Sequence, residues 1–280
     1  MSTDAQWNAA LYSDNTAHHR AFDDHILGPV TIEATNSLLD LGSGAGDLTA
    51  KLATAVPNGS VIGIDASLPL ITTSTTRFAD AHNVSFVHLR AQDLDQLAPL
   101  RLPSGQVTGP PFDVILSVAT LHWVPNEDHP TVYRHVFDLL VGGGQFRADF
   151  GGAGQIASVR AILDEESEAL GGGTTPWYFP SAEEVTTRLV EAGFIVGDGF
   201  VRLVTQRRSV ADFAALVDWL DSQVLIAYQP SLDQGAYPIF RARAIERFRA
   251  IGPRQDGSFD QDYIRVDVLV TKPLSPATAK

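Results

Sequence analysis

The first half of the chain alternates short apolar runs with stretches of helical periodicity. The apolar runs are rich in β-branched and aromatic residues and are bounded by glycine, proline or polar clusters, which is typical of strands. Helical stretches lie near residues 68–81 and 131–140, and the second ends at three glycines, a common helix stop. Strands that alternate with helices predict a parallel, doubly wound α/β sheet. The predicted strands are residues 38–41, 61–65, 84–89, 112–117 and 145–150.

The second half has a more helical pattern. Residues 156–170 are periodic, and a further helix is predicted to begin at Ser181, with Glu184 three positions later as in a capping box. Residues 210–224 and 238–250 are amphipathic and predict further helices. Residues 263–270 then alternate apolar and polar positions, which predicts a closing strand.

Composition and charge narrow the range of functions. The chain has 280 residues, no cysteine and a net charge of −13. A chain without cysteine excludes disulfides and thiolate chemistry, and phosphate backbones repel so acidic a protein, which argues against a nucleic-acid partner. No stretch reaches the ~18 apolar residues of a membrane span, and the first residues lack the pattern of a signal peptide.

These properties predict a cytoplasmic protein that acts on a small molecule. The histidines show no ligand spacing with nearby carboxylates, so no metal is expected. Neither composition nor pattern indicates an oligomeric state.

The segment from Asp40 to Gly46 carries the most specific signal. It places glycines at every second position directly after a predicted strand, and Asp65 ends the next strand about 20 residues later. Glycine lets a turn adopt left-handed angles and lets a ligand lie against the backbone. The spacing differs from that of a dinucleotide site, and the carboxylates of Asp40 and Asp47 suit a cationic ligand better than a pyrophosphate. Without Asp65, an ordinary tight turn would explain the glycines about as well.

This glycine segment resembles motif I of the class I S-adenosylmethionine-dependent methyltransferases. Further matching features follow in the family's order, namely Asp65, the pair Gln92-Asp93, the strand at 112–117 and the segment Leu121-His122-Trp123. The resemblance covers roughly residues 36–150 and the last strand, although the family's proline before the fifth strand is missing from residues 140–144. It implies a Rossmann-like, seven-stranded sheet whose last strand is antiparallel, with helical insertions that form a lid.

The resemblance also implies S-adenosylmethionine as the cofactor. In the family, the glycine loop passes the methionine part, the acid after the second strand holds the ribose, and a later carboxylate meets the adenine amino group. The implied cofactor-binding residues of the core are Asp40, Gly42, Ser43, Gly44, Asp65, Ala66, Gln92, Asp93 and Ser117.

A narrower resemblance lies outside this core. Trp7 and Tyr12 match the N-terminal segment of the trans-aconitate methyltransferase-like group, in which a helix covers the cofactor. The resemblance implies that both residues bind the cofactor, where aromatic faces would stabilise its sulfonium cation. Alternatively, they only fasten the N-terminal helix. The segments around His122-Trp123 and Trp177-Tyr178 also resemble this group.

His122 is the candidate catalytic residue, because it follows the fourth predicted strand at the edge where α/β proteins bind ligands. It would act as a base or donate a hydrogen bond to the substrate, with a purely structural role as the alternative. The candidate substrate contacts are His122, Trp123, Trp177, Tyr178 and Arg241.

The roles of the arginines are left open by the sequence. Arg241 would hold a substrate carboxylate, or it would lie with Arg243 on a solvated helix face. Arg147 lies within a strand that has the pattern of a buried one, and we expect it to pair with Asp149 or with a helix acid.

Together these features predict methyl transfer to a small molecule, with O-methylation of a carboxylate or hydroxyl as the first expectation. The alternatives are a protein of the same fold that uses the cofactor without transferring its methyl group, a binding module without turnover and, disfavoured by the glycine spacing, a dehydrogenase. The predicted organisation is an N-terminal helical cap (1–35), a cofactor-binding core (36–150), a mostly helical acceptor-pocket region with one core strand (151–262), the final strand (263–272) and a tail (273–280).

Overall fold

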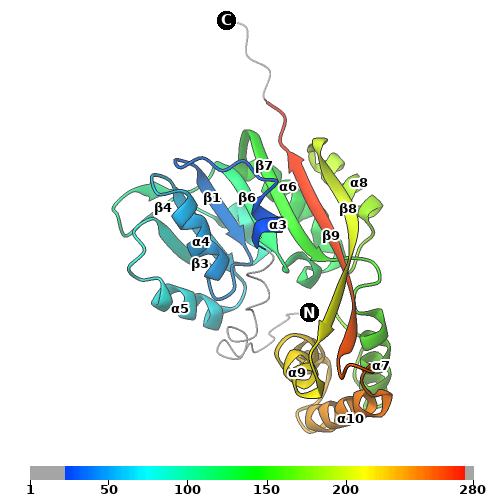
Figure 1. Cartoon of the computed structure of the whole chain (residues 1–280). Helices are drawn as coiled ribbons and strands as arrows, with labels where there is room; N and C mark the ends of the chain where they lie inside the picture. The colour runs from blue at the N-terminus through cyan, green and yellow to red at the C-terminus, as the bar shows by residue number, and fades with distance from the viewer. Residues whose placement is uncertain (1–22, 275–280) are drawn as a thin grey trace, which may run out of the picture.

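The computed structural model describes residues 23–274, and the remaining residues are drawn in grey in Figure 1. Trp7 and Tyr12, with most of the predicted cap, lie outside the described residues. No helix in the described part is long and apolar enough to cross a bilayer.

The described residues form a seven-stranded sheet with the strand order β3-β2-β1-β6-β7-β9-β8 (Figure 1). Strand β9 (Phe259–Thr271) is antiparallel to both of its neighbours, and the other six strands run in one direction. The predicted seven-stranded α/β sheet with an antiparallel last strand is therefore confirmed. The six parallel strands are β1 Ser37–Leu41, β2 Ser60–Asp65, β3 Val84–His88, β6 Phe112–Val118, β7 Leu140–Gly151 and β8 Ile195–Val210.

Helices cover both faces of the sheet, and β1 shows how its residues divide between them. Leu39 packs into the cluster that also contains residues of α6 and α8, whereas Leu38 packs with residues of α3 and α4 on the other face. Strands buried on both faces read as continuous apolar runs, which explains why they are visible in the sequence. The helices on these faces are α3 Asp23–Leu27, α4 Asp47–Ala55, α5 Leu68–Arg77, α6 His129–Leu139 and α8 Ala182–Ala192, and a small hairpin of β4 Leu100–Arg101 and β5 Val107–Thr108 lies outside the sheet.

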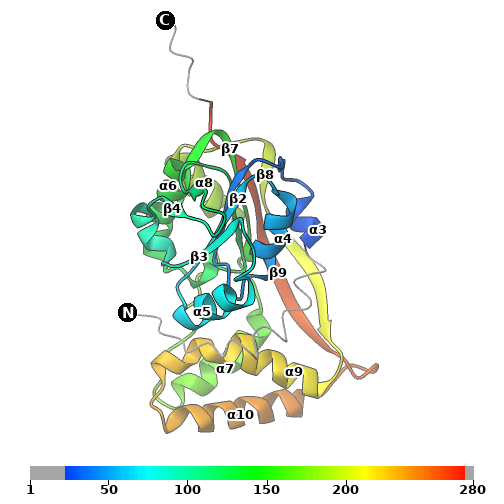
Figure 2. The ribbon, with the colours of Figure 1, turned by 90° about the vertical axis from the view of Figure 1, so that its left-hand side faces the viewer.

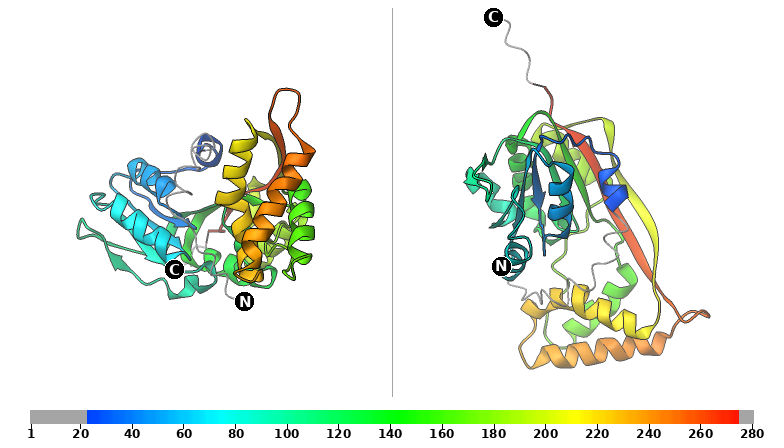
Figure 3. Two further views of the ribbon diagram at one scale, coloured as in Figure 1. Left: turned by 90° about the horizontal axis from the view of Figure 1, so that it is seen from below. Right: turned by 60° about the vertical axis from the view of Figure 1, so that its left-hand side comes forward.

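A separate helical layer packs at the end of the sheet where β7 ends and α7 begins. Figures 2 and 3 show it beneath the sheet, carried by the long extensions of β8 and β9. It has its own core, in which Leu163, Tyr228 and Phe240 are fully buried. The layer consists of α7 Ala157–Glu168, α9 Phe213–Trp219 with its continuation through Leu220–Val224 and Leu225–Ser231, and α10 Ala236–Ile251.

Two elements begin at residues other than those predicted. The helix expected at 210–224 begins at Phe213, because Val210 still pairs with Phe259 as the last residue of β8. The same pairing starts β9 at Phe259, four residues before the predicted 263. The capping box at Ser181 and Glu184 is confirmed, with both reciprocal bonds present.

Candidate active site

The glycine turn between β1 and α4 is shaped by backbone that only glycine adopts readily. Gly42, Gly44 and Gly46 have φ values of 83°, 54° and 88°, and a Cβ at Gly42 would overlap the side chain of Thr120. Asp65 fastens the turn to the end of β2, because its Oδ2 accepts a 2.9 Å bond from the N–H of Gly44. The turn is therefore held in a left-handed conformation beside a carboxylate.

Asp40 places a second carboxylate under this turn. Its side chain is buried and accepts a 2.6 Å bond from the Thr49 hydroxyl. Burial, with a smaller contribution from the charge of Asp65, raises the pKa of Asp40 to about 7, and burial also raises the pKa of Asp65. A cationic ligand beside the turn would offset both effects, since a nearby opposite charge favours the ionised form.

Ser43 adds a polar atom that fits a ligand at the turn. Its Oγ is buried and has no hydrogen-bond partner among the described residues. Buried hydroxyls usually have a partner, so the turn offers one unfilled hydrogen-bonding position. The donor set thus fits S-adenosylmethionine, which carries both cationic and hydrogen-bonding groups.

The other predicted cofactor residues lie along the same edge of the sheet or behind it. Asp93 follows β3, and its bond of 2.6 Å from Arg90 Nε lowers the pKa of its carboxyl, so it stays ionised. Gln92 donates to Asp128 at 3.1 Å, and Ala66 is exposed directly after Asp65. Ser117 is fully buried and donates to the carbonyl of Leu41, which ties β6 to the start of the turn.

A pocket adjoins the glycine turn through the segment that follows β6. Thr120 packs on Gly42, while Ala119 and His122 on either side of it line the pocket. The aromatic lining residues are His122, Trp123, Trp177, Phe179, Trp219 and Tyr263. The other lining residues are Ala119, Gln155, Ile156, Gln223, Val224 and Arg265.

Backbone strain is concentrated at this pocket. Among the described residues, the non-glycine residues with positive φ are Ala119 at 56° and Ile156 at 43°, and both line the pocket. Such angles are costly, above all for a β-branched residue, and they cluster at functional sites in proteins. The position of these two residues supports the pocket as the candidate ligand site.

His122 lies in the wall of the pocket as a neutral imidazole. Its Nδ1 accepts a bond of 3.4 Å from the N–H of Gly151, which leaves the proton on Nε2. Burial, together with the charge of Arg265, lowers the pKa of His122 well below its usual value. In this state His122 is a hydrogen-bond donor at Nε2 and a poor base.

Arg265 is a pocket residue that the sequence analysis missed. It is 4% exposed, and its Nε donates to Asp149 Oδ1 at 2.7 Å. Arg241, the predicted carboxylate ligand, is not in the lining and instead forms a two-bond pair with Asp221 at 2.7 and 2.6 Å. The signal for Arg265 was a charged residue within the alternating apolar pattern of the last strand.

Of the predicted aromatic substrate contacts, Trp123 and Trp177 line the pocket and Tyr178 does not. Trp123 and Trp177 stand edge-to-face in the pocket with ring centroids 5.3 Å apart. Trp177 is 8% exposed, and its Nε1 has no hydrogen-bond partner among the described residues. Tyr178 is not in the lining and donates to Glu184 instead.

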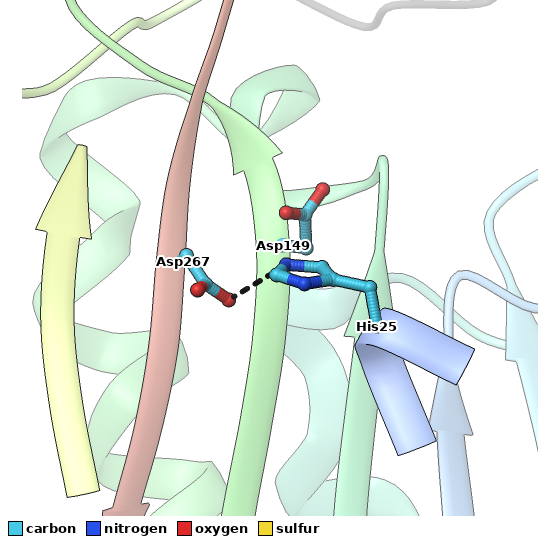
Figure 4. Close-up of side chains that lie close together, drawn as sticks. All are labelled: His25, Asp149 and Asp267. Carbon is cyan, nitrogen blue, oxygen red and sulfur yellow. Dashed lines mark ion pairs between the residues drawn. The ribbon is translucent and has the colours of Figure 1, made fainter. Parts of the chain in front are cut away.

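A cluster of buried charges lies behind the pocket, on β7 and β9. Figure 4 shows His25 of α3 beside Asp149 and Asp267, with the His25 Nε2 to Asp267 Oδ1 distance at 3.6 Å. Arg147 pairs with Asp267 at 2.6 Å, so the expected pairing with Asp149 is wrong. His25, Asp149 and Asp267 lie close enough together to hold a metal ion. Both carboxylates already pair with arginines, however, and the charge of these arginines disfavours a metal ion.

Comparisons with known proteins agree with this geometry. A model of the methyltransferase domain family matches residues 39–146. An uncharacterized methyltransferase of Schizosaccharomyces pombe is 29% identical over 68% of this chain and 71% of its own length. A trans-aconitate 2-methyltransferase of Methylobacterium radiotolerans is 27% identical over 96% of this chain and 99% of its own length. The YcgJ protein of Bacillus subtilis has the same fold, with a TM-score of 0.56 at 15% identity over 92% of this chain and 100% of its own.

The strand order, the glycine turn and the acid at the end of β2 are those of the class I S-adenosylmethionine-dependent methyltransferases, and the comparisons support this class for the chain. It is an enzyme whose cofactor is S-adenosylmethionine. Within the family, its similarity over nearly the whole chain is to proteins named trans-aconitate 2-methyltransferase.

Cofactor affinity is expected to depend on pH through Asp40. Because its pKa is about 7 in the cofactor-free protein, and a bound cation favours the ionised carboxylate, affinity should be constant above pH 7. Below pH 7 it should fall by up to tenfold per pH unit, as protonation competes with binding. Calorimetric titration with S-adenosylmethionine between pH 5.5 and 7.5 measures this dependence.

Asp40→Asn should bind more weakly than the wild type and lose this pH dependence. The matched control is Asp47→Asn in the first turn of α4, because Asp47 is paired with Arg77 and half exposed. A wild-type affinity that does not change over this range would show that Asp40 does not sense the cofactor's charge.

Proposed function

We propose that this methyltransferase acts on a carboxylate of a small molecule and forms a methyl ester. The supporting observation is that the pocket offers hydrogen-bond donors but no effective base. Arg265, the Nε1 of Trp177 and the Nε2–H of His122 are donors, and no carboxylate is among the described lining residues. Phenols and amines must lose a proton to react, whereas a carboxylate is already ionised at pH 7.

Three donors and the aromatic walls of the pocket have parts in this reaction. When bound, S-adenosylmethionine supplies an electrophilic methyl group. Arg265 and Trp177 would hold the acceptor carboxylate by charge and by the unfilled N–H, and His122 would donate a third bond. The aromatic walls exclude water and restrict the acceptor to one orientation. Alignment of this kind supplies about 7–11 kcal/mol in favourable cases, so no base is required.

The names of relatives agree with a carboxylate acceptor. Several proteins similar over most of this chain are named trans-aconitate 2-methyltransferase, and trans-aconitate is a carboxylic acid. Their identities of 25–28% leave room for a different acid.

Transfer of a labelled methyl group to a panel of small acids, with matched alcohols and amines, tests the proposal. We expect base-labile methyl esters, and a kcat that is flat between about pH 6 and 9 because no proton must be removed. Label found only in ethers or amines, or a kcat that rises with pH as a base ionises, would refute it.

The same assay tests the donor role of His122. His122→Phe keeps the ring against Phe179 but removes the Nε2–H. We expect kcat/KM for the acid to fall about 10–100-fold, the value of one bond to a charged group, with unchanged cofactor affinity. The control is His82→Phe, since His82 is exposed and outside the lining. Unchanged kcat/KM in His122→Phe would assign His122 a structural role.

A further inference from the structure

The pocket has little capacity to neutralise negative charge. Arg265 is the charged side chain among its described lining residues, and part of its charge is offset by Asp149 at 2.7 Å. Both partners are almost fully buried, at 4% and 1% exposure. A buried carboxylate without a partner is strongly disfavoured. The pocket can therefore match one acceptor carboxylate, and a second or third would enter unpaired.

The walls of the pocket are built from aromatic rings. Trp177 lies 5.7 Å from Phe179 at an interplanar angle of 34°, and His122 lies 5.7 Å from Phe179 at 33°. Trp123 meets Trp177 edge-on at 81°. Rings at these separations favour offset and edge-to-face contacts with a further flat group. The remainder of the acceptor is therefore expected to be planar and apolar.

One unfilled donor agrees with this count of charges. The Nε1 of Trp177 is buried without a partner in the part of the chain that the structure describes. Together with the guanidinium of Arg265 it provides for the two oxygens of a single carboxylate. Gln155 adds no charge to this count: its Oε1 accepts a 2.6 Å bond from the N–H of Ile264, and its Nε2 group is a neutral donor.

We propose that the acceptor is a planar aromatic or conjugated monocarboxylic acid and that tricarboxylic acids are excluded. This inference rests on the proposed carboxylate methylation and adds the shape and charge of the acid. It departs from the substrate that the names of the relatives carry. The charge of −13 on the chain acts in the same direction, because it repels a trianion more strongly than a monoanion.

Three probes test the inference with the full-length enzyme and labelled S-adenosylmethionine. They are trans-cinnamate, which is flat and has one carboxylate, p-coumarate, which adds a phenol, and trans-aconitate, which has three carboxylates. We expect kcat/KM for trans-cinnamate to exceed that for trans-aconitate by at least about 100-fold, since two carboxylates of the latter lack partners. The product from p-coumarate should be the ester with a free phenol.

Each outcome bears on one of the two proposals. The proposal of a planar monocarboxylic acceptor would be overturned by a preference for trans-aconitate, by equal rates for the acids, or by turnover of neither aromatic acid. In each of these cases, the formation of any ester would leave the proposal of carboxylate methylation standing. An ether on the phenol of p-coumarate, with no ester from any of the three acids, would overturn carboxylate methylation itself.

A variant of the aromatic wall provides a second test. Trp219→Leu removes a ring that lines the pocket, and we expect KM for trans-cinnamate to rise about tenfold with little change in kcat or cofactor affinity. Trp219→Phe should restore most of the loss. The control is Phe137→Leu, which removes a ring that packs on Phe194 away from the pocket. An unchanged KM in Trp219→Leu, with an unchanged melting temperature, would contradict the role of the aromatic wall.

Discussion

Replacement of Asp65 by asparagine is expected to raise the dissociation constant for S-adenosylmethionine by at least about 100-fold. Both carboxylate oxygens of Asp65 accept backbone bonds, Oδ2 from Gly44 at 2.9 Å and Oδ1 from Ser67 at 2.8 Å. An asparagine side chain has one acceptor oxygen, so its NH2 group would face an N–H donor. The substitution also removes the charge at the position where the family holds the ribose.

Calorimetric titration measures this change, and thermal unfolding separates it from loss of the fold. The control is Asp47→Asn, which removes a carboxylate from the first turn of α4, where it pairs with Arg77 on the half-exposed surface at 2.7 Å. That variant should bind the cofactor within about threefold of the wild type, since exposed pairs contribute little. An Asp65→Asn protein that is folded and binds as tightly as the wild type would remove Asp65 from the cofactor site.

The sheet could be predicted from the sequence because its central strands are buried on both faces. The runs around Leu39 and Ile62 are mostly apolar, interrupted in β1 by Asp40, and each ends in glycine or polar residues at the edge where ligands bind. The glycine turn was also visible, because its left-handed angles require glycine. Both features depend on residues that are close together in the sequence.

Strand β8 was not located by its pattern. Its residues pair on one side only, with β9, and several are exposed, so the segment mixes apolar and charged positions without a clean alternation. Its boundary with α9 was therefore placed too early. An edge strand takes its structure from its neighbour, and this information is not local.

The partner of Arg147 was predicted wrongly for a related reason. Arg147 and Asp149 lie two residues apart on β7, and this proximity suggested a pair. The register instead places Asp149 opposite Asp267 of β9, so that two like charges face each other. Each carboxylate then pairs with an arginine, Asp267 with Arg147 and Asp149 with Arg265. Register between distant strands decides these partners, and with them the identity of the pocket arginine.

The second large effect is expected for the fully buried Arg147. Its Nη1 lies 2.6 Å from Asp267 and also donates to the carbonyl of Val268, and its Nε donates to the carbonyl of Ile26, which joins α3 to the sheet. Arg147→Met should leave the buried Asp267 with only the half-exposed Arg202 as an arginine partner, and it should lower the free energy of unfolding by about 3–5 kcal/mol. For a chain of this size, that corresponds to a melting temperature lower by roughly 6–20 °C.

A double-substitution cycle on the cofactor-free protein shows whether the charge of Asp267 is the cause. Arg147→Met combined with Asp267→Leu should recover at least half of the lost free energy, because a buried pair replaced by apolar residues is close to neutral. Recovery stays partial, since the carbonyls that Arg147 bonded remain without their donor. The control is Arg202→Met, which removes a half-exposed partner of the same carboxylate and should cost less than about 1 kcal/mol. A double variant as unstable as Arg147→Met would assign the loss to those carbonyls and to the attachment of α3 instead of to the buried charge.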